Sequence, residues 1–231
     1  MRLRSSALAL LVVAAVAPAA PAVASRQPEI RVDPGIAEHT VTAFTIERDG
    51  RIERDERVET WVSATHARVV YSDARTGEVL GACAGTRTRV SCFDRDPRLE
   101  VALGGDGHLF EPSWAQSGRS VRRALARGWL TQVEMTDHRG TAARRLTSTA
   151  AATGDDGETT ILAERETLAV LFRRTTGATA TGTITSTEDV LVRERLPLAR
   201  VDLRLNAPER AKVRTRVLRR PRASAQRRRA R

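Results

Sequence analysis

Lysine, aromatic residues and long apolar runs are all scarce in this chain of 231 residues. Lys212 is the only lysine, so arginine supplies almost all of the positive charge. Aromatic residues make up 3% of the chain, so the core must consist mainly of valine, leucine, alanine and isoleucine. The longest uninterrupted apolar run, Ala7 to Ala17, has 11 residues. A helix that spans a bilayer needs about 20 apolar residues, so no transmembrane span is predicted.

The start of the chain has the three parts of a secretory signal peptide. Arg2 and Arg4 supply the positive charge, the apolar run follows, and Ala22-Val23-Ala24 has the small-x-small pattern of a cleavage site. The sequence therefore predicts a signal peptide over residues 1–24 that is cleaved after Ala24. The mature protein is expected to be secreted, outside the cytoplasm.

Cysteine is limited to Cys83 and Cys92. An oxidising compartment favours a disulfide between them, and the turn-forming residues that separate them place the two on neighbouring antiparallel strands. Closing so short a loop contributes roughly 2–3 kcal/mol in the chain-entropy model. No histidine or third cysteine nearby completes a metal site, and the CxxC spacing of a redox pair is absent.

The positive charge is concentrated at the C-terminus. Residues 208–231 contain ten arginines and Lys212 but only one acid, Glu209, whereas residues 25–207 are close to neutral. This distribution predicts a domain over residues 25–207 followed by an arginine-rich, disordered tail over 208–231. The tail has three interpretations: a tether to an anionic envelope surface, a tolerated solvated extension, or a nucleic-acid-binding segment. Specific nucleic-acid binding is disfavoured, because the tail has no recognition element and no aromatic residue.

Short β-branched segments, several of them separated by turn residues, predict an antiparallel meander. Asp49-Gly50 and Thr76-Gly77 are typical hairpin turns. The strands expected before and after the central helix are 40–47, 57–63, 67–72, 78–84, 89–94 and 99–103, then 130–136, 143–148, 159–163, 168–173, 181–187 and 190–194.

One helix is expected in the middle of the chain, over residues 113–128. Its apolar stripe at helical spacing consists of Trp114, Gly118, Val121 and Leu125. At its start, Ser113 and Gln116 have the spacing of a capping box. At its end, Gly128 suits a left-handed conformation, with Trp129 folding back toward Ala124. The fold class is therefore mainly β with some α.

No local motif for catalysis is present. Neither GxSxG nor HExxH occurs, and each histidine falls on a separate predicted strand or loop: His39, His66, His108 and His138. We therefore predict no catalytic residue, no metal site and no cofactor. A hydrolase whose active site assembles from distant residues stays open as a third hypothesis.

Three stretches of the sequence resemble the LolA-like lipoprotein-carrier superfamily, which includes the RseB sensor domain and mycobacterial lipid-binding lipoproteins. Residues 41–73 are similar to its opening strands, with Glu59-Thr60-Trp61-Val62 and Arg68-Val69-Val70-Tyr71 in the places of two strand motifs. Residues 120–149 are similar to the helix and following strands of actinobacterial relatives, and residues 191–213 to the closing strand region.

This resemblance implies a curved antiparallel sheet, an incomplete β-barrel covered by one or two helices, with an apolar cavity for acyl chains. Alternation along the strands and the helix stripe then suggests the residues that line such a cavity: Trp61, Val69, Tyr71, Leu80, Phe93, Val121 and Leu125. The alternative is that these side chains fill a solid core, as they do in most small barrels.

The first functional hypothesis is therefore a secreted, non-enzymatic protein that binds a lipid, a lipoprotein acyl chain or another apolar ligand. The cationic tail would hold it near anionic envelope surfaces. The alternative is a sensory or protein-interaction module of the cell envelope, similar to the RseB branch, that contacts its partner through a sheet edge.

Overall fold

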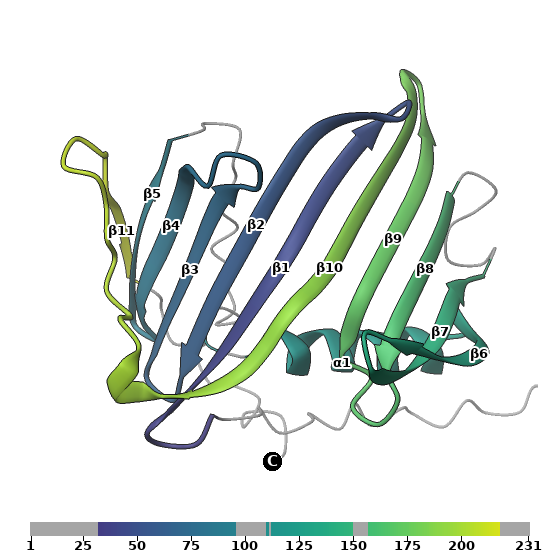
Figure 1. Cartoon of the computed structure of the whole chain (residues 1–231), viewed down its shortest axis with the longest axis horizontal. Coiled ribbons are helices and arrows are strands. Elements are labelled where there is room, and N and C mark those ends of the chain that lie inside the picture. The colour runs from purple at the N-terminus through teal and green to yellow at the C-terminus, as the bar shows by residue number, and fades with distance from the viewer. Residues whose placement is uncertain (1–31, 96–109, 111, 150–156, 218–231) are drawn as a thin grey trace, which may run out of the picture.

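All the strands belong to one open antiparallel sheet (Figure 1). The computed structural model describes residues 32–95, 110, 112–149 and 157–217; the predicted signal peptide, the strand expected over 99–103, His108 and most of the predicted tail lie outside these ranges. The strands are β1 Ile36–Arg48, β2 Arg51–Ser63, β3 His66–Asp73, β4 Val79–Thr86, β5 Arg89–Asp94, β6 Leu130–His138, β7 Thr141–Ser148, β8 Gly157–Glu164, β9 Val170–Thr179, β10 Gly182–Pro197 and β11 Arg214–Val217.

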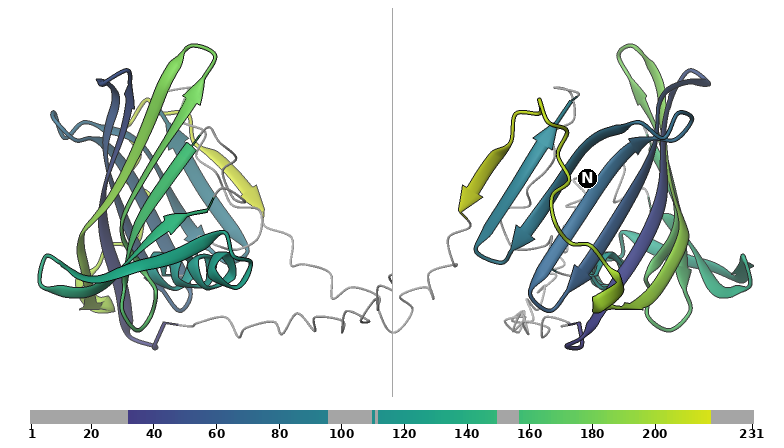
Figure 2. Two further views of the ribbon diagram at one scale, coloured as in Figure 1. Left: turned by 90° about the vertical axis from the view of Figure 1, so that its right-hand side faces the viewer. Right: turned by 60° about the vertical axis from the view of Figure 1, so that its left-hand side comes forward.

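Two meanders meet in the middle of the sheet. The order is β11-β5-β4-β3-β2-β1-β10-β9-β8-β7-β6. Strands β1 and β10 are therefore neighbours in the sheet although they are far apart in the sequence. Every residue of β1 has a partner in β10, from Ile36 opposite Pro197 to Arg48 opposite Ile184. The sheet bends around the side that carries the helix and does not close, because β11 and β6 remain edge strands (Figure 2). This confirms the predicted curved antiparallel sheet with an incomplete barrel form.

The two faces of the sheet differ in what covers them. Paired residues of antiparallel strands share a face, and successive residues alternate between faces. We call the side that carries the helix the inner face; it includes Val69, Cys83, Leu146 and Ile161. The opposite side, which includes Trp61, is the outer face.

The inner face holds two separate apolar clusters rather than one. Residues of β2 to β5 form the first with Val32 and Phe110, and residues of the helix and β6 to β9 form the second. The disulfide between Cys83 and Cys92 is buried within the first cluster, and its cysteines are directly paired on β4 and β5. The predicted disulfide on neighbouring antiparallel strands is therefore confirmed.

Helix α1 spans Ser113–Ala126 and is the only α-helix among the described residues. None of those residues forms a helix long and apolar enough to cross a membrane. The predicted C-terminal end is confirmed: Gly128 has a φ of 69°, and the Trp129 amide donates to the Ala124 carbonyl at 2.9 Å. The predicted capping box is wrong, because Pro112 is the N-cap residue and no side chain caps the helix. Ser113 Oγ instead donates to Thr40 Oγ1 on β1 at 3.3 Å.

Most elements differ from their predicted ranges by a few residues at the ends, and two larger differences affect the arrangement of the sheet. The segments 181–187 and 190–194 form the single strand β10, in which a bulge opposite Val41 and Thr42 keeps the ladder continuous. Beyond Ala207, where the domain was expected to end, Arg214–Val217 pairs with β5 as β11. Arginine-rich composition indicated disorder there, but the free edge of β5 offers backbone partners that composition does not reveal.

Helix α1 is held against the turn between β8 and β9 by three contacts. A Cβ on Gly118 would lie 2.6 Å from the Thr167 carbonyl oxygen, so the helix backbone approaches this turn closely. Ser117 Oγ accepts a hydrogen bond from the Val170 amide at 3.1 Å, and Arg122 Nη1 donates to the Thr167 carbonyl at 2.7 Å. These contacts fix the middle of the helix on the second half of the sheet.

Replacing Gly118 by alanine tests this close approach. In an isolated helix the change would stabilise by about 1 kcal/mol, because glycine is a poor helix former. Here we expect Gly118→Ala to destabilise the protein by about 1–3 kcal/mol, because the added methyl overpacks the contact with Thr167. Urea unfolding measures the difference, with Ser120→Ala on the exposed helix face as the control. A Gly118→Ala protein with a higher free energy of unfolding than the wild-type protein would contradict the close contact between the helix and Thr167.

Candidate functional site

The sheet and the C-terminal half of α1 enclose a pocket of about 320 Å³ on the inner face, which we call the inner pocket. Its size lies within the usual range of about 300–1,000 Å³ for small-molecule sites. It is open to solvent on one side. The residues that line it are Ser120, Val121, Ala124, Trp129, Leu130, Ser148, Thr159, Ile161, Arg173 and Thr175.

The apolar part of this pocket comes from the second inner cluster. Val121 of the helix and Ile161 of β8 are buried, and Leu130 at the start of β6 closes the cluster beneath them. Trp129, which follows the helix end, is 43% exposed and forms part of the pocket wall. The arrangement offers apolar walls that remain accessible from solvent.

The N-terminal half of the helix is seated much more tightly. Only about 30 Å³ remains between Trp114 and the strands beneath it, roughly the room for one water molecule. The guanidinium carbon of Arg193 lies 5.0 Å from the centre of the Trp114 ring, and Arg193 Nη1 lies 3.0 Å from Glu164 Oε2. The usable space beneath α1 is therefore confined to its C-terminal half.

One end of the inner pocket is polar. The Oγ1 atoms of Thr159 and Thr175 lie 3.2 Å apart, and Arg173 stands beside them on β9. Arg173 Nη1 lies 3.5 Å from Glu188 Oε2, and the buried Arg173 Nε has no hydrogen-bond partner among the described residues. Because the positively charged guanidinium of Arg173 lines this end of the pocket, this end suits an acceptor or anionic group on a ligand.

Glu164, the last residue of β8, has a lowered pKa because of its contacts close to α1. Burial raises that pKa, but the hydrogen bonds from Thr167 Oγ1 and Arg193 Nη1, with the charge of Arg193, outweigh burial and hold it below its usual range. Glu164 therefore stays ionised and links β8 to β10 at the position where Trp114 packs.

The residues predicted to line a cavity are divided between the two faces. Val121 lines the inner pocket, and Leu125 packs against the same cluster. Val69 and Tyr71 lie on the inner face but belong to the other cluster, where burial raises the pKa of the Tyr71 hydroxyl.

The other three predicted residues are elsewhere. Trp61 pairs with Arg68 and Phe93 with Ala82, which places both aromatic rings on the outer face. Leu80 lies in the bulge where the pairing of β3 and β4 shifts, without a direct partner in β3. The seven residues therefore do not form one lining.

Alternation along one strand correctly indicates which of its residues share a face of the sheet. It does not indicate which residues of the next strand lie on that same face. A bulge or a change of pairing reverses the face, and neither is visible in the residue types. Arg173, Thr159 and Thr175 were missed for the same reason, because polar residues on a strand are expected to face solvent.

No known protein family and no curated protein sequence matches this chain. Similar solved structures include a chain of the Pseudomonas aeruginosa MucA/MucB complex (17% identity, TM-score 0.38, 69% of this chain and 52% of that one). They also include a LolA superfamily protein of Nitrosomonas europaea (9%, 0.30, 71% and 87%) and the Mycobacterium tuberculosis lipoprotein LppX (13%, 0.32, 65% and 84%).

A protein of the LolA superfamily, which the sequence resembles, is thus among the similar solved structures. This chain spans about half the length of the chain that it matches in the MucA/MucB complex, 52%. Because each of these TM-scores is below 0.5, the likeness carries no argument about function, and the description of the site rests on the residues above.

A pH titration of stability tests the Glu164 linkage. The pKa of Glu164 is lower in the folded than in the unfolded chain, so its ionised form stabilises the fold above the unfolded value, near 4.5. That stabilisation is lost as the pH falls through the lowered pKa. We expect Glu164→Gln to have a lower melting temperature than the wild-type protein at pH 7. The difference between the two melting temperatures should narrow toward pH 3. Glu166→Gln, in the same turn, serves as the control. An equal difference in melting temperature at both pH values would contradict the link between the ionisation of Glu164 and the stability of the fold.

Proposed function

We propose that this protein is an extracytoplasmic, non-enzymatic binding protein whose ligand is a lipid, a lipoprotein acyl chain or a similar apolar molecule. The ligand occupies the inner pocket, with its chain against Val121, Leu130 and Ile161 and its polar end toward Arg173. The observation that carries the proposal is an accessible apolar pocket with the guanidinium group of Arg173 at its polar end.

The driving force is burial of the alkyl chain. Each methylene removed from water contributes about 0.8 kcal/mol, so a few methylenes in the pocket give useful affinity without a specific hydrogen bond. Arg173 then adds selectivity for ligands with an acceptor or an anionic group near the chain end. A hydrolytic role gains no support here, because His39, His66 and His138 lie on β1, β3 and β6, and none of them lines the inner pocket.

The ligand enters without displacement of the helix. The middle and N-terminal half of α1 are fixed by Gly118, Ser117 and the packing of Trp114, whereas the pocket opens to solvent beside the C-terminal half. Entry past Trp129 therefore requires side-chain movement only.

Retention near the envelope is assigned to the arginine-rich C-terminal segment, which extends from β11. Each arginine near an anionic membrane surface contributes about 1 kcal/mol at low salt, and several act together. This part of the proposal is independent of the pocket, since the segment lies beyond the strands that form it.

Quenching of tryptophan fluorescence tests the pocket directly, because Trp129 is the only tryptophan that lines it. We expect a brominated fatty acid to quench the wild-type protein, and Trp129→Phe to remove most of the quenching. Thr175→Phe should weaken the interaction by more than about tenfold, since displacing two methylenes costs about 1.6 kcal/mol.

The matched control is Thr176→Phe. Thr176 neighbours Thr175 on β9 and forms a similar hydroxyl contact, with Thr185 at 3.2 Å, but it faces the outer side of the sheet. We expect its quenching curve to overlay the wild-type curve. Equal weakening by both substitutions, or no quenching of Trp129 at any concentration, would rule out the inner pocket as the binding site.

A further inference from the structure

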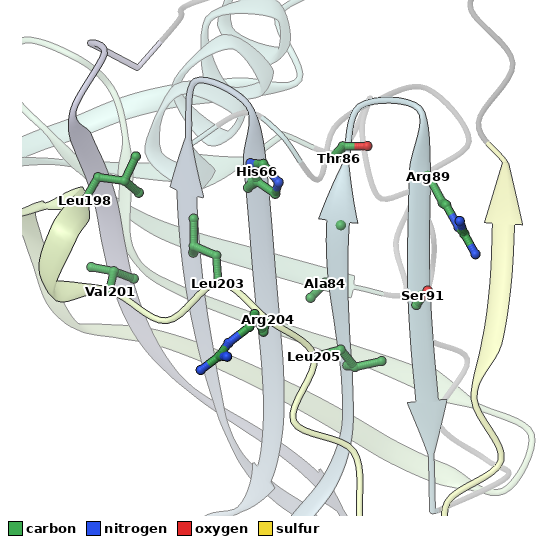
Figure 3. Close-up of a pocket in the computed structure, with 11 residues that line it drawn as sticks. His66, Ala84, Thr86, Arg89, Ser91, Leu198, Val201, Leu203, Arg204 and Leu205 are labelled. Atoms are coloured by element: carbon green, nitrogen blue, oxygen red, sulfur yellow. The ribbon is translucent and has the colours of Figure 1, made fainter.

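A second and larger cavity lies on the outer face, away from α1. After β10 and the short 3-10 helix η2 (Leu198–Arg200), residues 201–205 cross the outer face of the first meander; we call Leu198–Leu205 the strap. Between the strap and strands β3 to β5 is a cavity of about 600 Å³, the outer pocket (Figure 3). Its lining residues are His66, Ala84, Gly85, Thr86, Arg89, Ser91, Leu198, Val201, Leu203, Arg204 and Leu205.

The floor of the outer pocket is made of small residues on a buried face. Ala84 is only 5% exposed although it lies on the side opposite the helix, and Gly85 and Ser91 lie beside it on β4 and β5. Such a floor has no large side chains that could fill the space above it. An elongated molecule could therefore lie close to the backbone of the sheet.

The roof is the strap, which is held by few backbone bonds. Val201, Leu203 and Leu205 alternate with exposed polar residues and are half-buried, so their side chains point toward the sheet. Arg68 Nη1 donates to the Asp202 carbonyl at 2.9 Å, but no backbone hydrogen bond joins 202–209 to the sheet in the described part of the chain. The strap is thus an aliphatic cover that rests on the sheet without being a strand of it.

The charged side chains that line the outer pocket are Arg89 and Arg204, and no aspartate or glutamate is among the lining residues. Arg204 is paired with Asp202, with Arg204 Nε 3.0 Å from Asp202 Oδ1, and this pairing raises the pKa of Arg204. The Arg89 side chain is exposed and forms no ion pair or side-chain hydrogen bond with any described residue, although its backbone pairs within the sheet. The pocket therefore combines aliphatic walls with an unpaired cation.

We infer that the outer pocket is a second ligand site, which takes a single-chain anionic amphiphile such as a long-chain fatty acid. The alkyl chain lies between Leu203 and Leu205 above and Ala84 below, and the carboxylate meets Arg89. An alkyl chain suits this space because it requires no hydrogen bonds from the apolar walls, and the anionic head complements the unpaired cation. The inference is independent of the inner pocket, with which it shares no residue.

Native mass spectrometry with palmitate counts the sites. The wild-type protein should bind two molecules, and Ala84→Phe, which fills the outer pocket, should bind one. Thr175→Phe, which fills the inner pocket, should also bind one. A single site that Thr175→Phe abolishes would overturn the outer pocket and leave the inner one intact. A single site that Ala84→Phe abolishes and Thr175→Phe does not would overturn the inner pocket and leave the outer one intact.

The charge requirement has its own test, which leaves the packing of the pocket unchanged. Arg89→Gln should weaken palmitate binding at the outer pocket by about fivefold, the effect of losing one exposed ion pair. Hexadecanol, which has the same chain but no charge, should be unaffected. Arg200→Gln, in η2 but outside the pocket, removes an equal charge nearby and should change neither ligand. Equal effects of both substitutions would show that net charge rather than the site is responsible.

Photochemical labelling of the wild-type protein avoids any question of folding. A fatty acid that carries a diazirine near its chain end should label peptides containing 84–91 and 198–205 in addition to peptides of the inner pocket. Labelling confined to the inner-pocket peptides would overturn the second site.

Discussion

The pairing of β1 with β10 is the constraint on which the rest of the structure depends. It joins two meanders that would otherwise be separate sheets, and it does so between residues far apart in the chain, such as Ile36 and Pro197. Contacts of such long range close a large loop, which costs entropy but fixes the global shape. Side chains reinforce the junction: Arg195 Nε lies 2.7 Å from Glu38 Oε1, and His39 Nδ1 lies 2.8 Å from Glu194 Oε1. The bent sheet that results provides both an inner hollow for α1 and an outer surface for the strap.

Each half of the sheet then completes its burial in a different way. In the first half, the disulfide and Phe110 cover the inner face, and the outer face, with Ala82, Ala84 and Phe93, is buried on the side that the strap crosses. In the second half, α1 covers the inner face, tightly at Trp114 and loosely near Trp129. With only 3% aromatic residues, the chain has few large side chains with which to fill these spaces. Unfilled space against the sheet, as in the inner and outer pockets, is therefore expected for a core built from valine, leucine and alanine.

Local features of the fold were predictable from the sequence, and relations between distant elements were not. The hairpin turns at Asp49-Gly50 and Thr76-Gly77, the disulfide and the end of α1 at Gly128 follow from residue chemistry over a few positions. The helix start at Ser113 was predicted correctly, but the capping box was not formed, because Ser113 engages Thr40 of a distant strand instead. The candidate site was only partly predictable: Val121 and Leu125 follow from helix periodicity, whereas Arg173 and the strap depend on pairings that a single sequence does not specify. The placement of Trp61 and Phe93 on the outer face has the same origin.

We propose that this bent sheet holds apolar molecules rather than a filled interior. The most direct measurement is a mass spectrum of the protein purified from a secreting host, first under native conditions and then after denaturation. We expect a native mass that exceeds the chain mass by one or two aliphatic molecules, which denaturation releases and lipid analysis identifies. A native mass equal to that of the chain, together with no uptake of added fatty acid or hexadecanol, would contradict it.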